Sequence, residues 1–488
     1  MAEPVGVEDP EVYPVAVSKV PLIRRYRVNK ARTQLGSVWP PNAIVLARNA
    51  RALRRHRPWE AYLARRGELE GGLDERARRA LGWIRTSQDQ VGSGGVGDYQ
   101  FGGWTPGYPE VTGYIIPTLW DYHRALGDDD LAQRAIRMAD WELGLQKPKG
   151  GFESLYEGDN QPPVVFNTGQ VIRGLVRTYQ ETEEERYLDA ATRAGDWIVA
   201  MQEPDGSWAK ANYRGMKRTY DAFVSAAVAG LFLATSDEVY ANAARRQCEF
   251  VLRNQRANGW FDLCDNTPEG NATPSTHTLC YTADGLLETG EKLKESAFVE
   301  ACERATAAMT DRVEPGGRLP GRFDSDWRPA CDYVVVTGSA QLGVVLDKLY
   351  MRSGDERQLR TALELLDFLA FVQDLSAAGR NRSGGLPGSY PIWGGYVPMK
   401  YPSWPAKFFL DHLRLVRLAS EDESSHPESA SHPEPELTAV GNPASSAVWA
   451  ADEPGKPSEA NHRSRRWGEM YIGIGTLLII ILLIILLA

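Results

Sequence analysis

Apolar residues at helical spacing alternate with turn-forming segments along most of this chain. The clearest unit, DWIVAMQEPDGSW at 196–208, is a helical run that ends in Met-Gln, followed by a Pro-Asp-Gly turn and an aromatic residue. Related units lie at 140–152 and 249–261, and degenerate copies lie at 82–95, 303–317 and 367–380. Their glutamines recur at a period of about 50–60 residues, the scale of one supersecondary unit, with Met309 in place of glutamine in one copy.

Between these units the pattern predicts a second set of helices with Gly and Ala along one side. Such helices can crowd into an inner ring because small residues let backbones approach closely. They begin near Val111, Asn167, Tyr220, Thr276, Val336 and Pro405. Six helical hairpins that close on themselves bury both ends of the array, whereas an open solenoid needs polar capping repeats. We therefore predict an all-α fold, an (α/α)6 toroid.

The hairpins divide the chain into four regions. Residues 1–74 are predicted to be an N-terminal helical arm, 75–418 the toroid that carries catalysis or binding, and 419–467 a disordered linker rich in Ser, Pro and Glu. Residues 468–488 are predicted to be a transmembrane tail anchor, because 471–488 is an uncharged apolar run. Eighteen helical residues span about 27 Å, close to the bilayer core.

The charged residues argue against one class of partner and predict the location of the protein in the cell. The net charge is −9, which gives no electrostatic footprint for nucleic acid. Arg463, Arg465 and Arg466 precede the apolar run, and no charged residue follows it. By the positive-inside tendency, this predicts a cell-membrane protein whose main domain stays in the cytoplasm.

Candidate site residues gather in the loops before the predicted inner helices, which should share one rim of a toroid. The candidate catalytic residues are Glu110, Asp221, His277 and Tyr281. The candidate substrate-binding residues are Trp104, Tyr108, Tyr114, Asn167, Gln170, Tyr220, Asp326, Trp327, Asp332, Tyr333, Tyr401, Trp404 and Lys407. We predict no cofactor and assign no metal ligand.

These residue types suit a carbohydrate cleft, in which aromatic rings stack on sugar faces and polar groups bind hydroxyls. Glu110 with Asp221, or either with Asp326, forms a candidate acid and base pair for glycosidic chemistry. Alternatively, His277 or Tyr281 takes a proton beside a uronic acid carboxylate that Asn167 and Gln170 neutralise. Each residue also has a structural alternative: Asp221 and Asn167 as helix N-caps, Glu110 as a first-turn acid and His277 as a core residue.

Two resemblances to known protein families bear on the choice of function. The Gln-to-aromatic units at 146–152, 202–208 and 255–261 resemble the repeats of the squalene–hopene cyclase and protein prenyltransferase toroid superfamily. The segment GYPEVTGYIIPTLWDY at 107–122 is similar to toroid domains of six-hairpin glycosidases, uronate lyases and glucuronyl C5-epimerases. The acid motif that terpene chemistry implies is incomplete at 324–327, which reads Asp-Ser-Asp-Trp.

Three hypotheses about function follow. The first is a membrane-tethered enzyme that acts on a polysaccharide or glycan precursor as a hydrolase, lyase or epimerase. The second is a terpenoid cyclase-like or prenyltransferase-like enzyme, which would need a closed, apolar cavity. The third is a non-catalytic scaffold in glycan assembly. The expected partners are a saccharide, the membrane through the C-terminal helix, and glycan-assembly proteins.

Overall fold

A computed structural model describes residues 72–100, 103–376 and 381–425, all within one compact unit. Twelve α-helices dominate these residues. The first set is α4 (Gly72–Val91), α6 (Asp129–Leu145), α8 (Glu185–Met201), α10 (Glu238–Arg253), α12 (Ser296–Thr310) and α14 (Glu356–Val372). The second set is α5 (Pro109–Leu126), α7 (Val165–Thr182), α9 (Ala222–Thr235), α11 (Thr276–Leu293), α13 (Val336–Ser353) and α15 (Ser403–Ser425).

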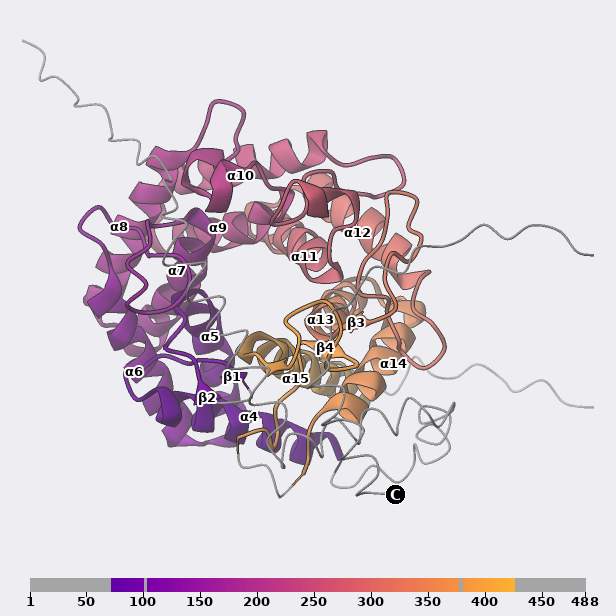
Figure 1. Ribbon diagram of the computed structural model, residues 1–488. Coiled ribbons are helices and arrows are strands. Elements are labelled where there is room, and N and C mark those ends of the chain that lie inside the picture. Colours follow the sequence, from indigo (N-terminus) through magenta and orange to yellow (C-terminus); the bar gives the residue numbers. More distant parts are fainter. Residues whose placement is uncertain (1–71, 101–102, 377–380, 426–488) are drawn as a thin grey trace, which may run out of the picture. The chain divides into compact units, whose positions relative to one another are not determined.

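The two sets form concentric rings (Figure 1). Helices α5, α7, α9, α11, α13 and α15 form the inner ring, in which each helix packs against its neighbours. The other six helices form the outer ring. The ring closes because α15 packs against both α4 and α5. The predicted all-α toroid of six hairpins is thus confirmed, and α15 continues beyond the predicted boundary at residue 418.

Small residues allow the inner helices to approach one another, as their pattern predicts. A Cβ atom on Gly174 of α7 would lie 2.5 Å from the Gly113 carbonyl oxygen of α5. A Cβ atom on Gly285 of α11 would lie 2.2 Å from the Ala222 carbonyl carbon at the start of α9. Larger residues at these positions would force neighbouring inner helices apart.

The repeated glutamine links five of the six hairpins to the next outer helix, and Met309 takes its place in the sixth. Gln202 Nε2 donates to the carbonyl oxygens of Gly206 in its own turn, at 3.1 Å, and of Ala243 in α10, at 2.8 Å. Gln88, Gln146, Gln255 and Gln373 make the equivalent pair of bonds. The motif therefore repeats because one polar side chain joins its own turn to the backbone of the next outer helix.

The turn glycine of the motif is required by both conformation and space. Gly206 has φ 90°, and a Cβ atom there would lie 2.3 Å from the Arg246 carbonyl oxygen of α10. Gly384 makes the same approach to Arg79 of α4, where the distance would be 1.9 Å. The last turn of the array is therefore seated on the first outer helix.

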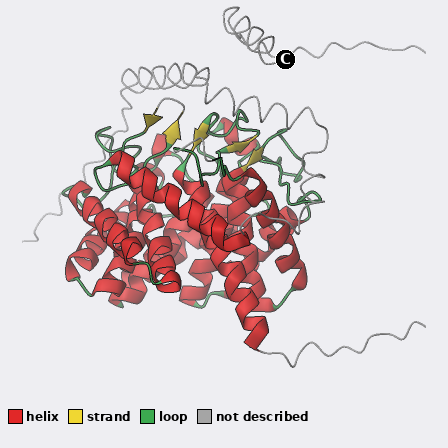
Figure 2. Ribbon diagram, turned by 90° about the horizontal axis from the view of Figure 1, so that it is seen from below, coloured by secondary structure: helices red, strands yellow, loops and turns green. Residues whose placement is uncertain are grey.

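The long loops that precede the inner helices lie on one face of the ring, together with the strands (Figure 2). The strands are β1 (Tyr99–Gln100), β2 (Gly103–Trp104), β3 (Val334–Val335), β4 (Ser389–Tyr390) and β5 (Lys400–Tyr401). They form two antiparallel sheets, with order β2-β1-β5 and pair β3-β4. The loop before α5 is thereby joined to the loop before α15, which gathers residues from both ends of the described chain at one rim.

Short 3-10 segments also lie in these loops, namely η2 (Ala209–Ala211), η3 (Tyr213–Gly215), η4 (Thr219–Asp221) and η5 (Glu269–Ala272). Within the described ranges, no helix has the length and apolar character needed to cross a membrane. Residues 419–425, predicted as the start of the disordered linker, belong to α15, so that boundary was wrong. The rest of the predicted linker, the tail anchor and nearly all of the predicted arm lie outside the described ranges.

Replacing Gly206 with Ala should lower the free energy of unfolding by roughly 1–3 kcal/mol, because the new Cβ would strain a left-handed residue against α10. Gly230→Ala in α9 is the matched control, since a Cβ there meets nothing within 4 Å. Removing a helical glycine at such a position should instead stabilise by about 0.4–1 kcal/mol. Chemical denaturation measures the free energy of unfolding of both variants. Equal changes in Gly206→Ala and Gly230→Ala would contradict the role given to the turn glycine.

Candidate functional site

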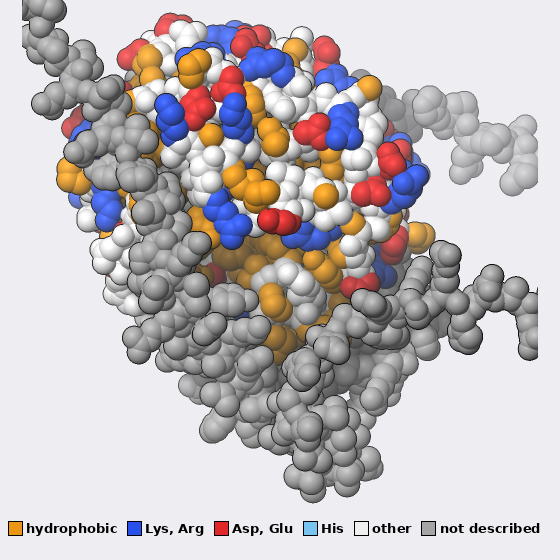
Figure 3. Space-filling view, turned by 45° about the horizontal axis from the view of Figure 1, so that its top comes forward, with side chains coloured by type: hydrophobic (Ala, Val, Ile, Leu, Met, Phe, Trp, Pro, Cys, Tyr) orange, Lys and Arg blue, Asp and Glu red, His pale blue; other side chains and the backbone are white. Residues whose placement is uncertain are grey.

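A cavity of about 380 Å³ opens among the loops on the strand-bearing side of the inner ring. Hydrophobic side chains line the hollow visible on the surface in Figure 3. The cavity is lined by Tyr108, Glu110, Ser154, Leu155, Val164, Phe166, Asn167, Tyr213, Arg218, Tyr220, Asn266, His277, Thr278, Tyr281, Tyr396, Val397 and Trp404. Glu110 is the only carboxylic acid and His277 the only histidine in this lining.

Packed aromatic rings from facing inner helices lie behind Tyr281. The centroid of the Tyr281 ring lies 4.7 Å from that of Phe223 on α9 and 6.0 Å from that of Phe408 on α15. The Tyr114 ring of α5 lies 5.7 Å from Phe408. This cluster gives the cavity an apolar base, while loops from several hairpins supply its polar wall.

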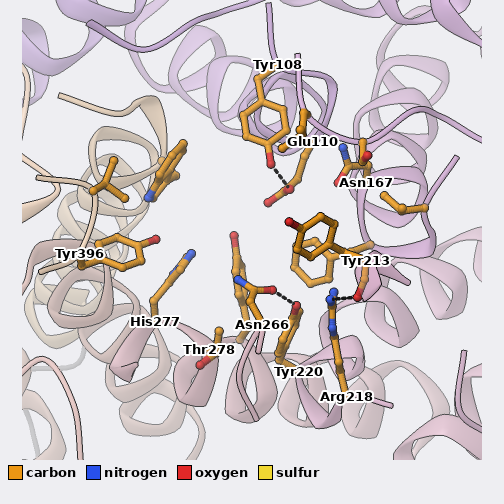
Figure 4. Close-up of a pocket in the computed structure, with 17 residues that line it drawn as sticks. Tyr108, Glu110, Asn167, Tyr213, Arg218, Tyr220, Asn266, His277, Thr278 and Tyr396 are labelled. Carbon is orange, nitrogen blue, oxygen red and sulfur yellow. Dashed lines mark hydrogen bonds between the residues drawn. The ribbon is translucent and has the colours of Figure 1, made fainter. Parts of the chain in front are cut away.

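Glu110 lies in the first turn of α5, immediately after Pro109, and its side chain points into the cavity (Figure 4). Its Oε2 accepts a hydrogen bond of 2.9 Å from the Tyr108 hydroxyl. Burial raises the pKa of Glu110 to about 7, and nearby Asp98 adds to the shift, while Tyr108 and Arg218 oppose it. Glu110 can therefore exist as a carboxylic acid near neutral pH and can donate a proton.

His277 lies in the first turn of α11, on another wall of the cavity (Figure 4). Its Nδ1 is 2.6 Å from Oε1 of Gln341 on α13. An amide oxygen only accepts hydrogen bonds, so Nδ1 carries the proton and the neutral ring keeps a lone pair on Nε2. Burial lowers the pKa of His277 to about 4, which keeps the ring neutral above that pH. His277 thus has the form of a general base.

Tyr281 is one helical turn beyond His277, and the centroids of the two rings are 4.3 Å apart. Burial, and then the charge of Glu110, raise the pKa of Tyr281 well above its ordinary value. Its hydroxyl is consequently neutral and can donate a hydrogen bond to a ligand. A base role for Tyr281, which requires loss of that proton, is opposed by its surroundings.

Four of the predicted binding residues also line the cavity, namely Tyr108, Asn167, Tyr220 and Trp404. Asn167 does not cap α7, since its Nδ2 donates to the Glu153 carbonyl oxygen at 2.9 Å. The Tyr220 hydroxyl donates to Oδ1 of Asn266, which holds two groups of the wall together. The roles of these residues in binding stay predictions.

Asp221 is not part of the cavity lining, although the sequence analysis paired it with Glu110. It is fully buried, and its Oδ2 accepts a 2.5 Å hydrogen bond from Asn212. Burial raises the pKa of Asp221 to about 6, while Arg218 and Asn212 oppose the shift. Asp221 therefore lies behind the wall, where it does not reach a ligand in the cavity.

The remaining predicted binding residues also lie outside the lining, so fewer of the predicted residues reach the cavity than the sequence analysis expected. Buried Tyr114, Gln170 and Lys407 belong to the inner-helix packing, and Lys407 Nζ pairs with Asp411 at 2.6 Å. Trp327 donates from Nε1 to the Asn258 carbonyl oxygen, beyond the inner helices. Trp104, Asp326, Asp332, Tyr333 and Tyr401 occupy the surrounding loops and short strands.

The sequence analysis missed six polar lining residues: Ser154, Tyr213, Arg218, Asn266, Thr278 and Tyr396. Thr278 lies within the first turn of α11, and the other five come from the loops before the inner helices. Tyr396 is held by Ser389, which receives the Tyr396 N–H at 3.1 Å and donates to its carbonyl oxygen. The only signal for it in the sequence is an aromatic residue after the Gly-Gly pair at 394–395.

Among the residues that the structure describes, no group of three or more His, Cys, Asp or Glu side chains is arranged to hold a metal ion. The polar groups at the cavity wall instead form a set suited to proton transfer and hydrogen bonding.

Comparison with solved structures places the fold among enzymes with the six-hairpin toroid. A heparin-specific unsaturated glucuronyl hydrolase matches with TM-score 0.58 and 14% identity over 72% of this chain and 98% of its own. Cellobiose 2-epimerase from Bacillus thermoamylovorans matches with TM-score 0.57 and 13% identity over 70% and 98%. A D-mannose isomerase matches with TM-score 0.56 and 12% identity over 71% and 97%.

No model of a known protein family matches the sequence, and no curated protein is similar to it. At these low identities, the structural likeness shows the fold alone.

Gln341→Glu should raise the pKa of His277, because a carboxylate facing Nδ1 favours the imidazolium form. Gln341→Met, which removes the acceptor without adding charge, is the control and should leave the pKa low. NMR of the imidazole nitrogens during a pH titration measures both the midpoint and the tautomer. A wild-type midpoint near 6.5 instead of about 4 would contradict the buried, neutral state of His277.

Proposed function

We propose that this protein is an enzyme that acts on a saccharide by acid–base proton transfer, in the manner of a sugar epimerase or isomerase. The observation that carries the proposal is that His277 and Glu110 line one cavity with pKa values displaced in opposite directions. The base is neutral and the acid keeps its proton over the same pH range. Such a displaced pair is characteristic of acid–base catalysis.

The two groups suffice for a balanced reaction. His277 Nε2 takes a proton from a sugar carbon next to a carbonyl group, as the C–H bond breaks. Glu110 gives its proton to the carbonyl oxygen, which forms an enol. The His277 imidazolium then gives its proton back to carbon, while the Glu110 carboxylate takes a proton back from a sugar oxygen. Delivery to the opposite face of the same carbon, with the proton removed from the enol oxygen, yields an epimer. Delivery to the neighbouring carbon, with the proton removed from the neighbouring hydroxyl group, yields an isomer. No oxidant, reductant or further reactant is consumed.

The polar groups on the cavity wall favour a sugar over a terpenoid as the substrate. Arg218, Glu110, His277 and the amides of Asn167 and Asn266 offer hydrogen bonds that hydroxyl groups would satisfy. Aromatic rings beside them can stack on a sugar face. The relatives by fold include an epimerase and an isomerase of sugars. A hydrocarbon substrate would leave those polar groups unpaired.

Glycoside hydrolysis is the second candidate, because several structures with a similar fold are glucuronyl hydrolases and because Glu110 has the raised pKa of a general acid. Hydrolysis by the common route uses two carboxyl groups on opposite sides of the scissile bond. Within the described lining, Glu110 has no second carboxyl group opposite it. The lining therefore favours proton transfer at carbon.

We also propose that residues 471–488 tether this enzyme to the cell membrane with the main domain in the cytoplasm. The support is the uncharged apolar run and the arginines before it. A glycan precursor assembled at the membrane, and the proteins that assemble it, are then the expected partners.

The pH dependence of kcat/KM should be bell-shaped. Activity should rise as His277 loses its proton, near pH 4, and fall as Glu110 loses its proton, near pH 7. Deuterium incorporation from D2O into a panel of aldoses and uronic acids, followed by NMR, provides the assay. Activity that keeps rising above pH 8 would exclude Glu110 as the acid.

Glu110→Gln should lower the rate of deuterium incorporation by about 10²–10⁴-fold, because an amide cannot supply the proton. The folded state should persist, since the glutamine oxygen can still accept the Tyr108 hydroxyl. Glu269→Gln removes an exposed acid from the loop before α11 and serves as the control. Its rate should equal that of the wild type, and an equal loss in both variants would indicate a general charge effect.

A further inference from the structure

Arg218 is a buried cation on the wall of the cavity, with 3% of its surface exposed. It lies in the loop before η4, between Tyr213 and Tyr220, and Figure 4 shows its guanidinium reaching the backbone of Tyr213. The guanidinium is also 5.3 Å from the centroid of the Tyr220 ring. A rigid aromatic and backbone setting thus fixes the position of the charge.

Most hydrogen-bonding capacity of Arg218 is unused within the described residues. A guanidinium has five N–H donors. One nitrogen, Nη2, donates to the Tyr213 carbonyl oxygen, and Nε is buried without a partner. Buried donors are nearly always satisfied in folded proteins. An acceptor supplied from the cavity would satisfy them.

Half-buried cations on the inner helices contrast with Arg218. Arg173 pairs with Glu288 at 2.7 Å, Arg177 with Asp121 at 2.7 Å and Lys348 with Asp284 at 2.6 Å. No carboxylate in the described ranges lies within 4.0 Å of Arg218 in an ion pair. Its charge acts on Glu110 and Asp221 from a greater distance, where it lowers the pKa of each. Arg218 is therefore a cation placed at a cavity instead of in a structural pair.

We propose that Arg218 binds a carboxylate of the substrate, so that the saccharide is a uronic acid or a glycan that ends in one. This inference rests on the proposed function. A planar carboxylate matches the fork of a guanidinium and carries one negative charge. A phosphate monoester carries nearly two, and the cavity offers one arginine beside an acidic Glu110. Charge balance thus favours the carboxylate.

The test measures binding to the full-length protein with Glu110→Gln in place, so that turnover does not interfere. The probes are D-glucuronate and D-galacturonate, their neutral counterparts D-glucose and D-galactose, and the 6-sulfate and 6-phosphate of glucose. Titration calorimetry should show the uronates binding roughly 10–100-fold more tightly than the neutral sugars, the range of a charged hydrogen bond.

Arg218→Gln should abolish this preference, so that the uronates bind no more tightly than the neutral sugars. Arg214→Gln is the matched control, because it removes the same charge from an exposed position in the same loop, over the Tyr213 ring. It should keep the preference. Should Arg218→Gln fail to fold, Arg218→Lys retains the charge without the planar fork and should keep only part of the preference.

Equal affinity for uronates and neutral sugars would overturn the inference, as would a preference for the sulfate or phosphate ester. Equal losses in the Arg218 and Arg214 variants would assign the effect to long-range charge and overturn it as well. Uronate binding that depends on Arg218, without deuterium incorporation in the wild type, would sustain this inference and contradict the proposed proton transfer. The two failures are therefore distinguishable.

Discussion

The close approach of each turn glycine to the backbone of the next outer helix is the constraint on which this ring depends. At Gly206 and Gly384 no room exists for a Cβ atom, because a carbonyl oxygen occupies its place. The glutamine before each such turn then joins that turn to the same helix through two hydrogen bonds. Since the last turn meets α4 as the others meet their successors, one local contact, repeated, closes the toroid.

Closure of the ring determines where the candidate catalytic residues lie. It directs the first turns of the inner helices, and the loops before them, to one face, where α5 supplies Glu110 and α11 supplies His277. Loss of water around these groups has opposite effects on an acid and a base, since it disfavours the charged form of each. Burial is the largest cause both of the raised pKa of Glu110 and of the lowered pKa of His277, so one physical effect prepares both partners for proton transfer.

In the described part of the chain, positively charged side chains are paired with carboxylates between the inner helices, whereas the one at the cavity wall is not. Cations such as Arg173 and Lys348 are neutralised by Glu288 and Asp284 on facing inner helices, which holds the ring together. At the cavity, Arg218 keeps unused donors. A group that costs free energy to bury without partners is stabilised when a ligand supplies them, so affinity and specificity arise from the same residue.

The sequence alone determined the architecture, because helical periodicity, turn glycines and the spacing of glutamines such as Gln202 are local properties that the fold repeats. It also placed Glu110, His277 and Tyr281 near the starts of inner helices. Only the tertiary structure decided that Asp221 lies behind the wall and that Trp327 packs in a distant turn. Only the tertiary structure likewise showed that Arg218 lies at the cavity wall. The burial and pairing of a side chain depend on contacts between loops of separate hairpins, and no local sequence pattern specifies those contacts.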